Sequence, residues 1–86
     1  MRVIVESQFV KDAQHLPDAV QKKLAAYVDI CSVNPFDVRL HAKPLSGPLQ
    51  GFFSFRIGRD YRALFRFVDP MTVFLSRVGN RKDIYR

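Results

Sequence analysis

The sequence has a single cysteine, two histidines and no long run of apolar residues. One cysteine, Cys31, cannot form a disulfide within the chain, and its apolar neighbours in a helix-like stretch predict a buried, reduced side chain. No apolar run approaches the roughly 18 residues needed to cross a bilayer, and the opening residues MRVIVESQF lack the apolar stretch of a secretion signal. We therefore expect a cytoplasmic protein with no membrane partner.

Further absences narrow the chemistry that the chain can perform. The histidines His15 and His41 are predicted to lie in a helix and in a linker, and neither forms a zinc-binding spacing with the cysteine. No glycine-rich phosphate loop is present, and no pattern points to a Ser-His-Asp triad. We therefore expect no metal and no cofactor, and we interpret both histidines as ordinary surface side chains.

Positive charge is concentrated in the second half of the chain. Residues 1–38 carry four basic and five acidic side chains, a net charge of −1, whereas residues 39–86 carry ten basic and three acidic ones, a net charge of +7. Such an asymmetry predicts one basic surface, for which nucleic acid is the usual partner. An acidic protein or an anionic membrane surface fits the same charge less well.

The hydrophobic pattern changes from helical to strand-like along the chain. An apolar stripe of Val20, Leu24, Tyr27, Val28 and Cys31 predicts an amphipathic helix, and later segments alternate apolar and polar residues as strands do. A linker at 35–50 contains three prolines and a glycine, so we expect it to be irregular. The expected elements are a strand at 2–6, helices at 7–15 and 16–34, and strands at 51–57, 61–67 and 71–79.

This order of elements predicts one domain of the α+β class that covers residues 1–86. We expect two layers, in which an antiparallel sheet of β-α-α-β-β-β order carries an αα-hairpin packed on one face. The last strand, 71–79, is apolar on both faces and should lie centrally in the sheet. Arg56, Arg62 and Arg66 alternate with apolar residues, so they should share the sheet surface that faces away from the helices.

Arginines on such a surface have an ordinary explanation as well. Charged side chains commonly occupy solvent-facing strand positions, where they discourage edge pairing. However, the second half of the chain has eight arginines and two lysines against three acids, whereas a merely solvated face usually mixes both signs. Because the arginine fork binds phosphate in a bidentate manner, we favour a surface that binds a nucleic-acid backbone.

Two segments, LSGPLQGFFSFRIGRDYR (45–62) and VGNRKDIYR (78–86), resemble the RelE/ParE superfamily of toxins from type II toxin–antitoxin systems, on the RelE or mRNA-interferase side. The resemblance extends over essentially the whole chain, including the order of its elements. It implies a small, basic, cytoplasmic toxin that binds the ribosomal A site and cuts messenger RNA there without metal or cofactor. It also implies a cognate antitoxin protein that wraps and neutralises the toxin.

The resemblance further implies roles for particular residues. Arg62 matches a sheet arginine that contacts the scissile phosphate, and Arg81 matches a basic residue assigned to transition-state stabilisation or acid catalysis. Tyr85 falls near a C-terminal tyrosine that some members use as a base. The expected catalytic residues are therefore Arg62, Arg81 and Tyr85. The expected RNA-binding residues are Lys43, Arg56, Arg59, Arg66, Arg77, Lys82 and Arg86.

The final segment departs from the family pattern at one position. Relatives with this tail often read GHRKDIYR, but here Asn80 occupies the histidine position and cannot take or give a proton. RNA cleavage through its own 2′-hydroxyl needs charge stabilisation at the phosphate and the handling of two protons. We therefore expect Tyr85 to act as the general base and Arg81 as the main stabiliser.

Two other functions share the same sequence features. A ParE-type toxin has this fold but inhibits DNA gyrase by binding the protein rather than by cutting RNA. A degenerate toxin would bind nucleic acid without catalysis. The arginine set on an open sheet surface, with a basic tail beside it, favours RNA over gyrase as the target.

Overall fold

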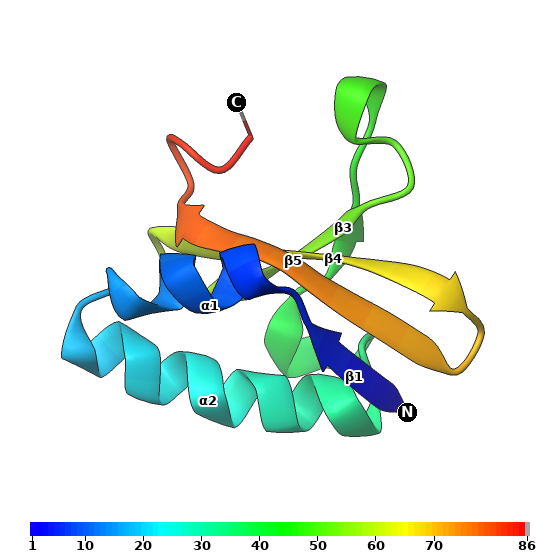
Figure 1. The fold of residues 1–86 in the computed structure, drawn as a ribbon, viewed down its shortest axis with the longest axis horizontal. Helices are drawn as coiled ribbons and strands as arrows, with labels where there is room; N and C mark the ends of the chain where they lie inside the picture. Colours follow the sequence, from blue (N-terminus) through cyan, green and yellow to red (C-terminus); the bar gives the residue numbers. More distant parts are fainter. Residues whose placement is uncertain (86) are drawn as a thin grey trace.

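Alternating apolar and charged residues in the second half of the chain form three neighbouring antiparallel strands of a five-stranded sheet (Figure 1). The computed structural model describes residues 1–85, so Arg86, one of the expected RNA-binding residues, lies outside the described residues. Helices α1 and α2 pack on the sheet and confirm the two-layer α+β fold. The elements are, in chain order, β1 (Arg2–Val5), α1 (Ser7–Gln14), α2 (Asp18–Val33), η1 (Val38–Leu40), β2 (Lys43–Pro44), η2 (Gly47–Leu49), β3 (Phe53–Ile57), β4 (Tyr61–Asp69) and β5 (Thr72–Asn80).

The strand order of the sheet is β1-β5-β4-β3-β2. Strands β3, β4 and β5 pair in antiparallel fashion, as the sequence predicts, and β5 lies inside the sheet between β1 and β4. Within residues 1–85, β1 forms the one parallel pair, in which Arg2 lies opposite Thr72 of β5. A parallel pair needs a long connection, and here the remainder of the fold supplies it.

The linker contains more regular structure than its prolines indicate. Strand β2 adds two residues to the sheet edge, with Lys43 opposite Ser54 and Pro44 opposite Phe53, and a short 3-10 helix lies on either side of it. The expectation of an irregular segment at 35–50 is therefore corrected. The sequence does not reveal this pairing, because it depends on a partner strand and not on any periodicity within the linker itself.

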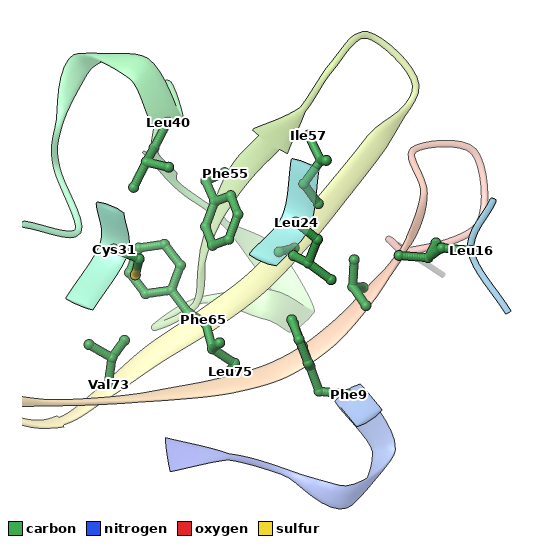
Figure 2. Close-up of a cluster of buried hydrophobic side chains, with 12 residues drawn as sticks. Phe9, Leu16, Leu24, Cys31, Leu40, Phe55, Ile57, Phe65, Val73 and Leu75 are labelled. Carbon is green, nitrogen blue, oxygen red and sulfur yellow. The ribbon is translucent and has the colours of Figure 1, made fainter. Parts of the chain in front are cut away.

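The core lies between the sheet and the two helices, where buried side chains from every layer converge (Figure 2). Phe55 and Phe65 from adjacent strands are fully buried, and each would cost about 3–5 kcal/mol of stability if truncated to alanine. Cys31 is also fully buried and free, which confirms its predicted core position. Burial raises the pKa of its thiol to about 11, so the side chain is unreactive at neutral pH.

The C-terminal tail, residues 81–85, folds back over the face of the sheet that the helices leave open (Figure 1). In Figure 1 this segment lies on the side of the sheet opposite α2. Ile84 is buried and packs close to Gly79, which pairs with Arg62 across the β4–β5 ladder. The tail therefore belongs to the folded domain and borders the surface on which the arginines were expected.

Candidate functional site

Five arginine side chains line one hollow of about 380 Å³ near the β3–β4 turn, which we call the arginine hollow. The turn, the start of the tail, helix α2 and the linker all contribute to its wall. The lining residues are Arg39, Arg56, Arg59, Arg62 and Arg81, together with Tyr27, His41 and Gly58.

Backbone pairing positions the strand arginines of the hollow. Arg56 of β3 lies directly opposite Arg62 of β4, so both side chains project from the same face of the sheet. Gly58 in the connecting turn has φ +68°, a conformation that favours glycine, and it allows the tight reversal that brings the two strands together. The backbone N–H of Arg81 donates to the carbonyl of Asp60 at 2.7 Å, which fixes the start of the tail against this turn.

Among the described residues, the hollow has more positive than negative charge. Within residues 1–85, no carboxylate forms a salt bridge with Arg56, Arg59 or Arg62. Nη1 of Arg62 donates instead to two backbone carbonyls, of Arg59 at 3.0 Å and of Tyr61 at 2.8 Å, and these neutral acceptors leave its charge in place. An anion such as a phosphate group would supply the missing negative charge.

Two further arginines of the hollow lie near acidic side chains, but the two ion pairs differ in distance. Arg81 lies 3.9 Å from Asp60, a distance at the outer limit of an ion pair, and both side chains are exposed. Arg39 forms a bidentate pair with Asp37 at 2.9 Å, and hydrogen bonds from Arg39 lower the pKa of that carboxyl to about 2. Arg39 is therefore held in place at the rim of the hollow, whereas Arg81 keeps most of its freedom to meet a ligand.

The structure places Arg66 and Arg77 outside the arginine hollow. Arg66 lies 3.5 Å from Glu6 and stacks on the Phe74 ring, with 4.8 Å from its guanidinium carbon to the ring centroid. Arg77 pairs with Asp12 of helix α1 at 2.7 Å. Both expected RNA-binding residues thus have carboxylate partners, unlike the strand arginines of the hollow.

The Asp12 carboxylate joins helix α1 to strand β5. Burial alone would raise the pKa of Asp12, but hydrogen bonds from Arg77, Gln8 and the Val78 N–H outweigh this effect and lower it below its ordinary value. The same pairing raises the pKa of Arg77. Both shifts indicate a charged pair that stabilises the fold.

Tyr85 lines a different hollow, of about 310 Å³, together with Lys43 and the segment that contains η2. Its hydroxyl donates to Ser54 Oγ at 3.3 Å, and the residue is 38% exposed. The expected base thus lies beside the expected RNA-binding residue Lys43 and does not line the arginine hollow. Lys82 is exposed in the tail.

Asn80, which stands at the position of an expected histidine, shapes the tail. Its side-chain oxygen accepts a hydrogen bond from the N–H of Lys82 at 2.9 Å, and its carbonyl accepts from Asp83 and Ile84. These bonds make a tight turn directly after β5. The residue therefore has a structural role that does not depend on proton transfer.

Besides Gly58 of the turn, three residues of the hollow were not among the expected site residues. Tyr27 was assigned to the apolar stripe of the long helix, and His41 was interpreted as a surface residue of the linker. Arg39 was counted in the basic half but given no role. Only the charge of Arg39 could have signalled its place from the sequence, because the other two reach the hollow through tertiary packing.

The arrangement is suited to binding an anion by side-chain charge. Among residues 1–85 no group of three or more His, Cys, Asp or Glu side chains is placed to hold a metal ion. Neither helix in this part of the chain has the length and apolar character that a membrane span requires.

Comparison with known proteins gives the same family as the sequence segments and the fold. A family model described as "ParE toxin of type II toxin-antitoxin system, parDE" matches residues 3–85. Toxin RelE3 of Methanocaldococcus jannaschii is 32% identical over 99% of this chain and 96% of its own length.

Solved structures of two toxin–antitoxin complexes are similar over nearly the whole chain. The RelBE2 complex of Mycobacterium tuberculosis contains a chain 30% identical to this one, with a TM-score of 0.77, covering 93% of this chain and 96% of that one. The RelB–RelE complex of Methanococcus jannaschii contains a chain 28% identical, also with a TM-score of 0.77, covering 95% and 94%. The chain therefore belongs to the RelE/ParE superfamily of type II toxin–antitoxin toxins, matched by the ParE toxin family model and by RelE-like structures.

Proposed function

We propose that this protein is an endoribonuclease that cuts messenger RNA in the ribosomal A site and so arrests translation. The observation that carries the proposal is the arginine hollow, in which Arg56, Arg59 and Arg62 have no carboxylate partner among the described residues. A phosphodiester in this hollow would receive bidentate hydrogen bonds from guanidinium groups already held by the β3–β4 ladder.

The chemistry would use the 2′-hydroxyl of the RNA as nucleophile. Attack on phosphorus places extra negative charge on the phosphoryl oxygens, and preorganised cations stabilise that charge best. Arg62 is fixed by the two carbonyls of its own turn, and Arg81 is exposed beside it at the start of the tail. We assign both to stabilisation of the transition state, and Arg56 and Arg59 to binding of the RNA backbone.

The partner of the toxin is proposed to be a cognate antitoxin protein. The similar chains from Mycobacterium tuberculosis and Methanococcus jannaschii were solved in complexes of toxin with antitoxin. By this similarity we expect an antitoxin to bind this chain and to block its activity.

A ParE-type action on DNA gyrase is the second candidate, because the matching family model carries the ParE description. Both functions are tested by inducing the toxin in cells and mapping message ends by primer extension. RNA cleavage predicts new ends at A-site codons with the wild type, weak ends with Arg62→Ala and Arg81→Ala, and unchanged ends with the control Arg77→Ala. Intact messages together with a DNA-damage response would overturn the proposal and support gyrase as the target.

Tyr85 is tested in the same experiment. Its assignment as general base comes from the family resemblance, and its hydroxyl now bonds to Ser54 in a separate hollow. Tyr85→Phe removes that hydroxyl and leaves the ring. Loss of cleavage with Tyr85→Phe would support the assignment, and full cleavage would remove Tyr85 from the list of catalytic residues.

A further inference from the structure

The arginine hollow supplies charge but few groups that can transfer a proton near neutral pH. Arginine stays protonated at all physiological pH values, and tyrosine ordinarily titrates near pH 10. Histidine is the residue type that ordinarily changes charge between about pH 5 and pH 8. Within residues 1–85, His41 is the one histidine that lines this hollow.

The backbone at His41 is unusual. Its φ of 50° and ψ of 43° lie in the left-handed region, and it is the only non-glycine residue among residues 1–85 with positive φ. Its N–H donates to the Val38 carbonyl at 3.2 Å, which closes η1 directly before β2 begins. Such conformations persist where the surrounding structure enforces them, and they are concentrated at functional sites.

Two tail positions that the resemblance links to proton transfer supply no such group to the hollow. Tyr85 donates its hydroxyl to Ser54 in a separate hollow. Asn80 has no titratable group, and it holds the turn of the tail through the N–H of Lys82. Tyr85 therefore lies outside the arginine hollow and Asn80 replaces the histidine of relatives, whereas His41 lines the hollow.

We propose that His41 is the general base of the reaction, an inference that rests on the proposed RNA cleavage. The neutral imidazole accepts the proton of the 2′-hydroxyl while the 2′-oxygen forms a bond to phosphorus and the bond from phosphorus to the 5′-oxygen breaks. The products are a 2′,3′-cyclic phosphate and a 5′-hydroxyl. The leaving 5′-oxygen takes its proton from water, and the imidazolium returns its proton to solvent, so the protein ends unchanged.

The test compares His41→Asn with the wild type in single-turnover cleavage of messenger RNA on programmed ribosomes. Asparagine also adopts the left-handed conformation, so the turn after η1 is kept while the proton acceptor is lost. We expect the cleavage rate to fall about 100-fold or more, in the range typical of a lost general base. Thermal unfolding of both proteins checks that the fold is retained.

The pH profile separates a base from a structural residue. A general base acts only in its neutral form, so the wild-type rate should rise with pH, and His41→Asn should lose this rise. His15→Gln, which changes the other histidine at the end of α1, should keep the wild-type rate and profile. In addition, His41→Gly fits the same backbone conformation and leaves room for free imidazole, which should restore cleavage.

The experiment separates a failure of the His41 assignment from a failure of the proposed function. If His41→Asn cleaves at the wild-type rate and with the wild-type pH profile, His41 is not the general base, and the proposed function still stands. A wild type that cuts no message would overturn the proposed function, and this inference with it. A slow His41→Asn variant, a flat pH profile and rescue of His41→Gly by imidazole together support His41 as the base.

Discussion

Two regions of one sheet carry arginines, and they differ in what faces the guanidinium groups. At the β3–β4 turn, Arg56 and Arg62 lie opposite each other, and no carboxylate among residues 1–85 forms a salt bridge with them. On β5, Arg77 is paired at 2.7 Å with Asp12 of helix α1. The alternating arginines look equivalent in the sequence, but the structure separates a group without carboxylate partners among residues 1–85 from a group paired with carboxylates of other elements.

The two groups of arginines also differ in how they affect the stability of the fold. Two arginines opposite each other on a strand pair repel, which costs stability unless an anion binds between them. A charged pair with several hydrogen bonds, such as Asp12 with Arg77, stabilises the folded state. Variants of the hollow should therefore change activity more than stability. Variants of the α1–β5 pair, Asp12 with Arg77, should change stability more than activity.

The largest effect is expected for Arg81→Ala. Removal of one donor to a developing oxyanion typically lowers the rate about 100- to 1,000-fold. Single-turnover cleavage on programmed ribosomes, with the unfolding midpoint measured in parallel, tests this expectation. An Arg81→Ala variant that cleaves within a factor of three of the wild type would place the main stabilising charge elsewhere in the hollow.

The α1–β5 pair offers the next largest effect, on stability. Asp12→Ala removes the acceptor for Arg77 and for the Val78 N–H, so we expect a loss of about 2 kcal/mol in the free energy of unfolding. Urea denaturation gives this number, with the exposed helical Asp29→Ala as a control that should stay within about 0.5 kcal/mol. Equal losses in both variants would mean that the pair has no special role.

The pH dependence of stability sharpens the same contrast. The folded-state pKa of Asp12 is lowered, so its charge stabilises the protein above the unfolded-state pKa of about 4, and this contribution is lost as the pH falls through the folded-state value. The stability gap between the wild type and Asp12→Asn should thus be full at neutral pH and should narrow under acidic conditions. Urea denaturation along a pH series measures the gap, and a gap that stays constant down to about pH 2 would contradict the assignment.

The smallest effect concerns the salt dependence of RNA binding. Each positive charge that contacts a phosphate of single-stranded RNA contributes about 0.7 to the slope of log K against log salt. Arg59→Gln should reduce the slope by about this amount, whereas Arg77→Gln should leave it unchanged because Asp12 already neutralises that charge. Fluorescence anisotropy of a labelled RNA at several salt concentrations distinguishes the two.

Much of the fold could be predicted because its signals are local. The helical stripe that contains Leu24 and Cys31 and the alternation around Phe55 and Phe65 depend on periodicity within each segment, and all four side chains are buried as expected. Strand β2 could not be found in this way. Two residues carry no periodicity, and their conformation comes from pairing with Ser54 and Phe53.

The site was harder to predict because it depends on contacts that are distant in sequence. Arg62 and Arg77 have similar surroundings in the sequence, and only the approach of Asp12, 65 residues before Arg77, separates their roles. His41 enters the hollow through an unusual turn in a proline-rich linker, where no pattern marks it. The positive charge of the second half predicted a basic surface, but it could not show which arginines have no carboxylate partner among residues 1–85.

The central claim is that the arginines of the hollow act on RNA, whereas Arg66 and Arg77, which pair with carboxylates outside it, hold the fold. It is tested most directly by removing one positive charge from each region, with Arg62→Gln and Arg77→Gln compared in single-turnover cleavage of messenger RNA on programmed ribosomes. We expect Arg62→Gln to lose about 100-fold or more in rate, and Arg77→Gln to cleave as the wild type does per folded molecule. Equal rates for the two variants would contradict the division of the sheet into these two regions.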